Sequence, residues 1–511
     1  MKLLSFLTIL MAVLYCSKSK TDNSKLGCMH CHKYKSDSIH KIGISCGVCH
    51  GGNSKSTTKE IAHKDFTPNP GDFSNVNKTC FLCHSEITQN ILKSPMTTNH
   101  GMILTNRKAF LEEQHHKYTD IGKLDFQNSG ADSYFSQLCA SCHLGKRKKQ
   151  VGEWKGYEKG GGCLACHLVY DTNSNKSHPR LQRLVDDSKC FNCHSRSSRI
   201  SLNYRGWMEL TYPTNQALAN VLADGRKVFQ GKPDIHYKAE MSCIDCHTSK
   251  EIMGTGSTKI QCTDCHKEIK ILSLPTHIQT KIGNKSLSVP EIQNHYSHEI
   301  EHKNLDCQSC HSQWAPQCIG CHISYQPDLI GYNHITEKEE QGKWIEEFGE
   351  FMSELPTLGV SVNGKFKPFV PGMKLTIDTS KFYQKTTPII EQNYFVPISP
   401  HTIGNSRDCK SCHMSPLALG YGRGIIEWTK DGKTKFYNKY DKTKGIPGDG
   451  WIQPFFQYSP DFNLSTHKEN RPLNVKEQRK ILKVGYCLQC HSGNSKVFKN
   501  FQDNINYTHL P

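Results

Sequence analysis

The chain has 511 residues, which is enough for two to four domains. Only 36% of the residues are hydrophobic and the mean hydropathy is −0.60, which excludes an ordinary hydrophobic core of the size expected for this length. The net charge of +17 would suit nucleic acid or an anionic surface, but no nucleic-acid-binding motif occurs.

The N-terminus has the pattern of an export signal. A basic start is followed by a mainly apolar run of thirteen residues from Leu3 to Tyr15, too short to span a bilayer but typical of a secretory signal. We expect residues 1–15 to be a signal peptide, Cys16 to be the lipid-modified residue of an outer-membrane lipoprotein, and residues 16–27 to be a polar tether. Tyr15 departs from the small residue usual before such a cysteine. The alternative is cleavage near Ser19, which would discard Cys16.

Twenty-four of the 25 cysteines fall into twelve Cys-x-x-Cys-His units, and only Cys16 is left over. The first six units are Cys28/Cys31/His32, Cys46/Cys49/His50, Cys80/Cys83/His84, Cys139/Cys142/His143, Cys163/Cys166/His167 and Cys190/Cys193/His194. The other six are Cys243/Cys246/His247, Cys262/Cys265/His266, Cys307/Cys310/His311, Cys318/Cys321/His322, Cys409/Cys412/His413 and Cys487/Cys490/His491. This run is typical of covalent attachment of haem c: both thiols bind one porphyrin edge, and the histidine becomes the proximal iron ligand.

Zinc sites and disulfides are the competing interpretations of these cysteines. A zinc ribbon uses two close pairs of cysteines, as 28/31 with 46/49 could supply, but it needs no histidine after each pair. A disulfide framework needs none either. Because the histidine is present in every unit, the sequence predicts twelve haems.

Haem also accounts for the composition. Twelve porphyrins would form the core around which the chain wraps, which explains the low hydrophobicity. A ferric haem with two ionised propionates carries one negative charge, so twelve of them, after loss of the leader, would bring the net charge to about +4. The basic excess therefore mostly compensates for propionates. The run Lys146 to Lys149 is expected to be a solvated loop or, alternatively, a docking patch for an acidic redox partner.

The units divide the chain unevenly. Residues 28–325 hold ten units and predict short helices joined by long loops, whereas residues 326–511 hold two units and a haem-poor segment. In that segment, residues 337–351 predict an amphipathic helix with Trp344 and Phe348 on one face. A hairpin turning at Asn363-Gly364 and another at Asp431-Gly432 follow. The predicted fold is a multihaem cytochrome c with a small β-containing insert, mostly short helices and loops wrapped around a haem chain.

Histidines outside the units are candidates for the distal iron ligands. Of 28 histidines twelve are proximal, and fifteen of the others could reach an iron, which nearly matches twelve sites and favours bis-histidine ligation. On one helix His295, His298 and His302 would share a face. The predicted distal ligands are His40, His63, His115, His178, His236, His277, His295, His298, His302, His334, His401 and His467.

Several phrases between the units resemble a group of large bacterial multihaem c-type cytochromes found in metal-respiring bacteria. They are "GGGCLACHL", "CFNCHSRSSRISLNYRGWMEL", "MSCIDCHTSKEIMGTG", "CQSCHSQWAPQCIGCH" and "FVPGM". The resemblance, which runs from about residue 28 to the C-terminus, implies an electron carrier in the periplasm or at the outer surface. The implied partners are a redox protein donor and acceptor, an outer-membrane porin-type conduit or an extracellular acceptor, with the membrane reached through the lipid anchor and no nucleic acid bound.

The alternative function is a multihaem reductase of a small nitrogen or sulfur oxyanion with one open haem iron. Nitrite reductases of this kind usually carry lysine in place of histidine in one unit, and no Cys-x-x-Cys-Lys occurs here. No other catalytic constellation stands out in the sequence. We therefore expect an electron-transfer protein with no catalytic residue of its own, rather than an enzyme.

Overall fold

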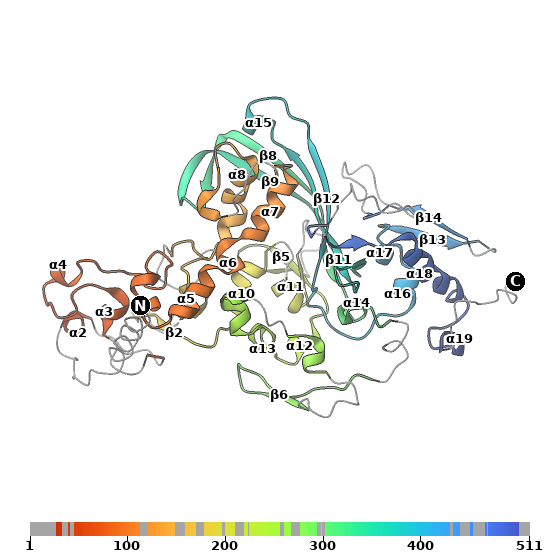
Figure 1. Ribbon diagram of the computed structural model, residues 1–511, viewed down its shortest axis with the longest axis horizontal. Coiled ribbons are helices and arrows are strands. Elements are labelled where there is room, and N and C mark those ends of the chain that lie inside the picture. The colour runs from red at the N-terminus through yellow and green to blue at the C-terminus, as the bar shows by residue number, and fades with distance from the viewer. Residues whose placement is uncertain are drawn as a thin grey trace, which may run out of the picture.

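The computed structural model describes residues 27–32, 39–40, 45–112, 120–148, 159–169, 178–196, 200–209, 219–222, 224–255, 260–266, 276–293, 298, 302–429, 433–439, 450–452, 465–467 and 469–499. The elements follow one another from an N-terminal end around α2 (Cys28–Cys31) to a C-terminal end around α19 (Lys496–Lys499) (Figure 1). The expected signal peptide, the tether with Cys16, His115 and His295 lie outside the described residues.

Short helices dominate the chain up to residue 311, as the sequence predicts. Because most of them have only one or two turns, they cannot be stable by themselves and depend on packing. They are α3 (Cys46–His50), α4 (Lys59–Ala62), α5 (Ser85–Leu92), α6 (Pro95–Thr98), α7 (His100–Ala109), α8 (Gly130–Gln137), α9 (Leu164–His167), α10 (Asp187–His194), α11 (Ile200–Tyr204), α12 (Ile235–Lys238), α13 (Cys243–Cys246) and α14 (Cys307–His311), with 3-10 turns η1 (Val76–Lys78), η2 (Cys80–Leu82), η3 (Ile121–Lys123), η4 (Cys139–Cys142) and η7 (Cys262–Asp264) and the π-turn η6 (Glu251–Thr255).

A six-stranded sheet forms the centre of the C-terminal part. Its order is β15-β10-β11-β8-β9, and β12 pairs with β11 beside that path. All pairings are antiparallel except that of β11 with β8. The strands are β8 (Ala315–Asn333), β9 (Lys338–Glu354), β10 (Thr357–Val360), β11 (Phe366–Asp378), β12 (Ile390–Pro397) and β15 (Arg471–Pro472).

Smaller elements complete the chain. Two-stranded and three-stranded sheets are β1 (Leu168–Val169) with β2 (Arg180–Leu181), β3 (Trp207–Glu209) with β5 (Lys227–Gln230) and β4 (Ala219–Val221), β6 (His277–Gln279) with β7 (Ser286–Ser288), and β13 (Gly424–Trp428) with β14 (Thr434–Asn438). The C-terminal helices are α15 (Ser380–Tyr383), α16 (Lys410–His413), α17 (Pro416–Leu419) and α18 (Val475–Cys487). Because β8 runs through residue 325, the sheet continues across the expected domain boundary.

The helix predicted over residues 337–351 is wrong, because this segment is strand β9, paired along its length with β8. The Glu-rich sequence favours a helix, but Gly342, with a φ of +91°, breaks that pattern. Trp344 is buried against α8 and β11, while Phe348, placed on the same predicted helix face, is 42% exposed. Tertiary pairing with an apolar strand therefore overrides local propensity.

Both predicted hairpins are confirmed. Strands β10 and β11 pair antiparallel around Gly364, whose φ of +74° suits the tight turn between them. Strands β13 and β14 also pair antiparallel, and their turn at residues 430–432 lies outside the described residues.

Two apolar clusters lie against the sheet. One joins α7 and α8 to β8, β9, β11 and β12 and includes Phe110, Tyr134 and Trp344. The other joins β10, α17, β13 and α18 and includes Leu419 and Leu482. The described parts of α2, α3, α4 and η7 contain no residue of these clusters. The hydrophobic core formed by protein side chains is thus concentrated around the sheet.

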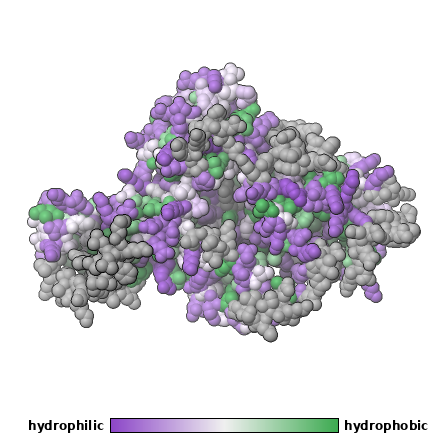
Figure 2. All heavy atoms as spheres, viewed as in Figure 1, coloured by the Kyte–Doolittle hydropathy of each residue, from purple (hydrophilic) through white to green (hydrophobic). Residues whose placement is uncertain are grey.

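The outer surface is mainly polar on the face seen in Figure 2, with apolar residues scattered singly. Within the ranges that the structure describes, no helix is both long and apolar enough to cross a membrane.

Candidate haem-binding sites

Most attachment units lie on a single helical turn. In seven of them the backbone N–H of the histidine donates to the carbonyl of the first cysteine, at 2.8–3.1 Å. Positions i and i+3 of a turn share a face, so both thiols point to one side and the imidazole follows them. Local geometry therefore suits attachment of one porphyrin edge. The seven histidines are His32, His84, His167, His247, His266, His413 and His491.

The second cysteines of units two and three are at least partly accessible in the described chain. Cys49 lies in α3, one turn after Cys46, and is only half-buried. Cys83 directly follows η2 and is exposed, although its backbone N–H donates to the carbonyl of Cys80 at 3.2 Å. Neither Cys49 nor Cys83 belongs to an apolar cluster of the described chain. The turns thus place both residues correctly for attachment, whereas a haem core around them stays a prediction.

The tenth unit has a different backbone. Cys318, Cys321 and His322 lie in strand β8 opposite Phe351, Phe348 and Glu347 of β9. Cys321 is buried in the cluster around Trp344, and His322 is exposed. This unit thus lies in an extended strand, whereas most of the other units lie on a helical turn. The positive φ of Gly320, +78°, bends the strand between the two cysteines.

Seven proximal histidines each face one predicted distal histidine. A metal held by a nitrogen of each ring, at about 2 Å, would separate the ring centres by roughly 6 Å. The observed separations of the ring centroids are close to this value. They are His32–His63 at 6.0 Å, His50–His178 at 5.7 Å, His84–His40 at 6.5 Å, His247–His401 at 6.2 Å, His266–His236 at 6.1 Å, His311–His298 at 6.4 Å and His413–His302 at 6.1 Å.

Hydrogen bonds orient many of these rings in the same way. A backbone carbonyl can only accept, so an Nδ1 within hydrogen-bond distance of one must carry the proton, which leaves Nε2 free to bind iron. Proximal rings donating from Nδ1 are His50 to Thr67, His167 to Gln182, His266 to Pro290, His311 to Gly404 and His413 to Ile481, at 2.7–3.0 Å. Distal rings doing so are His63 to Lys59, His178 to Pro179, His298 to Gln293 and His401 to Ser399, at 2.6–2.9 Å.

The residues present fit an iron held between two imidazoles. Burial lowers the pKa of His413 to about 4, and it also lowers the pKa of His50 and His401. These imidazoles are therefore neutral near pH 7, which is the form that binds a metal. His236 is oriented by the carboxylate of Asp234, whose Oδ1 lies 2.9 Å from Nδ1.

The other predicted distal ligands that the structure describes are His277, His334 and His467, while His115 and His295 lie outside the described residues. Among the described residues, neither His277 nor His467 contacts an imidazole of an attachment unit; Nδ1 of each contacts the hydroxyl of the preceding threonine. His334 packs against Tyr332, and its Nδ1 lies 3.4 Å from Nζ of Lys146. Most of the predicted helix carrying His295, His298 and His302 lies outside the described residues.

Contacts between thiols place the units beside one another. A hydrogen bond from the Cys163 thiol is the main cause that lowers the pKa of Cys80 to about 6, and Cys193 lowers that of Cys142 to about 5 in the same way. Equivalent thiol pairs are Cys190 with Cys243 and Cys307 with Cys262. After burial, the largest cause that raises the pKa of a thiol is the charge of Cys28 for Cys46, of Cys190 for Cys166, of Cys265 for Cys246 and of Cys412 for Cys310.

These contacts form a connected, branched network. Units three, five, six, seven, eight, nine and eleven follow one another, and unit four joins at unit six. Unit twelve is tied to unit eleven, since a Cβ on Gly493 would lie 2.4 Å from Sγ of Cys409. At the other end, the pair His50–His178 joins unit two to the loop before unit six. Sequence spacing indicated the closeness of units one and two but missed the contacts between units distant in sequence.

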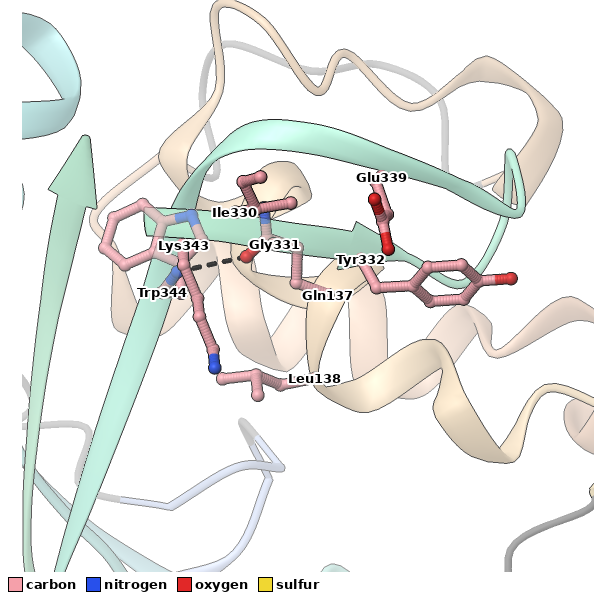
Figure 3. A pocket seen from close by; sticks show the side chains of 8 residues that line it. All are labelled: Gln137, Leu138, Ile330, Gly331, Tyr332, Glu339, Lys343 and Trp344. Atoms are coloured by element: carbon pink, nitrogen blue, oxygen red, sulfur yellow. Dashed lines mark hydrogen bonds between the residues drawn. The ribbon is translucent and has the colours of Figure 1, made fainter. Parts of the chain in front are cut away.

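Units four and ten approach the same aromatic cluster. Cys139 packs against it and Cys321 is part of it, and both thiols contribute to raising the pKa of Tyr134, whose main cause is burial. A cavity of about 200 Å³ lies beside this place, between α8 and the β8–β9 hairpin. There Gln137 accepts a hydrogen bond of 3.0 Å from the backbone N–H of Trp344 (Figure 3). The cavity thus lies where a helix packs on the hairpin.

The basic run after unit four is only partly a solvated loop. Lys148 is 8% exposed, and its backbone N–H donates to Asp72 at 3.1 Å. The backbone N–H of Arg147 donates to Glu337 at 2.9 Å. The expectation of a fully solvated run is therefore wrong for Lys148, because the run packs on the segment after unit two.

Comparison with known proteins gives one match. Residues 235–327, which include units seven to ten, match the family model of cytochrome c3. No curated protein and no solved structure matches the chain. Members of the matched family bind haem c covalently and transfer electrons. Together with the attachment units on both sides of the matched region, this match supports a multihaem c-type cytochrome.

Proposed function

We propose that the chain transfers electrons along twelve covalently bound haems. The electrons would pass between a periplasmic or quinol-derived donor and a terminal acceptor at or outside the outer membrane. The observation that supports this proposal is the closeness of successive units, from unit three through units five, six, seven, eight and nine to unit eleven. Bound haem would supply reversible one-electron chemistry at iron. The task of the chain is to hold successive sites side by side.

The paired imidazoles support transfer over catalysis. Two histidines at an iron leave no position for a substrate, and seven units have such a pair. Different burial and hydrogen bonding around each pair would spread the reduction potentials. A donor and an acceptor with different potentials could then be linked by one chain.

A reductase of small oxyanions is the second candidate. It needs an iron with an open position, and among the described residues His143, His167 and His322 face no second imidazole.

One mixing experiment separates the two candidates. Fully reduced protein is mixed with chelated ferric iron and, separately, with nitrite, hydroxylamine, tetrathionate and sulfite. We expect rapid oxidation by the iron chelate and no sustained turnover of the other four. Steady turnover of any of these at roughly ten per second or more would support the reductase instead.

We also propose that the protein is an outer-membrane lipoprotein anchored through Cys16. The short leader, the single cysteine outside the units and the polar tether after it support this. Exchange Cys16→Ser is expected to move the protein from the membrane to the soluble fraction, because no other anchor is predicted. A variant that stays with the membranes, or a mature chain that begins after residue 16, would contradict the anchor.

A further inference from the structure

An arginine lies between two attachment units that are distant in sequence. The backbone N–H of Arg407 donates to the carbonyl of Cys310 in unit nine at 2.8 Å. Its guanidinium donates to the carbonyl of Ser309 at 3.4 Å, and to the carbonyl and hydroxyl of Ser411 in unit eleven at 2.6 and 3.0 Å. Ser309 in α14 and Ser411 in α16 hold the same position in their units, directly before the second cysteine. Arg407 therefore bridges equivalent points of units nine and eleven.

Neutral groups hold this guanidinium in place. The carbonyls near the end of so short a helix have no amide partner within it, and those of Ser309 and Ser411 accept from Arg407 instead. The carbonyl of Pro356 accepts a further hydrogen bond at 3.4 Å. Carbonyls and a hydroxyl carry no net charge, so they orient the guanidinium without cancelling its positive charge. Arginine keeps that charge at every pH at which the protein is folded.

The charge of Arg407 acts on the second cysteine of each unit. Burial raises the pKa of Cys310 and of Cys412, and the charge of Arg407 lowers the pKa of both thiols. At Cys412 the effect of Arg407 is larger than the opposing effect of Asp408, which is an exposed carboxylate. Because haem attaches at these two sulfurs, the guanidinium lies beside both attachment points.

A fixed cation favours the reduced form of a nearby haem. Reduction adds one electron and breaks no bond, so the haem becomes more negative by one charge, and a positive charge nearby lowers the energy of that form. The half-buried position of Arg407 limits the screening of its charge by water. We propose that the guanidinium of Arg407 raises the reduction potentials of the haems at units nine and eleven together. This inference rests on the proposed function, since it requires a haem at both units.

Potentiometric titration of the holoprotein, followed by absorption, tests the inference. Exchange His302→Met in each form marks unit eleven, because methionine ligation raises the potential of that haem above the others. Arg407→Gln is expected to lower the potential of the marked haem and, without the marker, to move two of the twelve reduction steps to lower potential. Arg407→Met, which is also uncharged, should do the same. Arg407→Lys keeps the charge and should leave the potentials close to native.

Lys410→Gln is the matched control. It removes one positive charge from unit eleven itself, but Lys410 is exposed, so water screens its charge and the shift should be much smaller. The mass of each form gives its haem count. A native protein with fewer than twelve haems would count against the proposed function, whereas unchanged potentials in an uncharged variant with twelve haems would overturn only the role of Arg407.

Two further outcomes would overturn that role. One is a shift in Lys410→Gln as large as that in Arg407→Gln, because the position of the charge would then not matter. The other is loss of haem from both uncharged variants, because Arg407 would then act by holding the two units in place.

Discussion

Removal of the sixth unit is expected to slow electron passage sharply between the N-terminal units and those from Cys243 onward. The exchanges Cys190→Ala and Cys193→Ala remove both attachment thiols. Unit six contacts units four, five and seven through these two cysteines, and in the described chain it provides the contact to unit seven. Without a haem at unit six, the N-terminal units and those from Cys243 onward would be separated by the width of one haem site. The rate of transfer between them would drop, because electron transfer slows steeply with distance.

The experiment needs a site at which electrons enter the protein and a haem whose spectrum reports their arrival. A photoreducing ruthenium complex on Ile61→Cys, which is exposed near the first two units, would inject electrons. Exchange His302→Met would mark unit eleven, because methionine ligation changes the absorption band and raises the potential. Removal of unit twelve through Cys487→Ala and Cys490→Ala is the control, since that unit lies beyond the reporter. Equal reporter rates in the two deletion variants would contradict the order of contacts.

Loss of the buried ion pair between α7 and α8 should cause the largest loss of stability. Arg107 and Asp132 are 2% and 1% exposed and form two hydrogen bonds of 2.8 Å. Asp132 also accepts from the backbone N–H of Asp125 at 2.9 Å. Exchange Arg107→Met would leave the carboxylate buried without its cation, at a cost of about 3–5 kcal/mol in the free energy of unfolding.

Arg471→Met is the matched control for this exchange. Arg471 also forms two hydrogen bonds with a carboxylate, that of Glu477, at 2.9 Å each, but the two side chains are 37% and 21% exposed. Its removal should cost about 1 kcal/mol or less. Denaturant unfolding of the holoprotein measures both. A loss for Arg107→Met no larger than that for Arg471→Met would show that α7 and α8 do not depend on the pair.

The sequence predicts well the features of the structure that depend on a local pattern of residues. The attachment units are recognised from five consecutive residues, and the structure places most of them on the helical turns that the spacing requires. The hairpin at Gly364 follows from two turn residues. Seven of the predicted distal histidines face a proximal one.

The sequence does not predict the features that depend on contacts between segments distant along the chain. The segment 337–351 has helical composition, but β8 and the buried site for Trp344 make it a strand. Which histidine faces which, as for His413 with His302, is set by tertiary packing rather than by order in the chain.

The central claim is that every unit carries a covalently bound haem, and the mass of the intact denatured protein tests it most directly. Thioether bonds survive denaturation, so each attached haem adds its mass to that of the mature chain. We predict twelve additions, including one at Cys318 and Cys321 in strand β8. A mass with fewer than twelve haems would contradict the count, and with ten or fewer the connected array of sites would be lost.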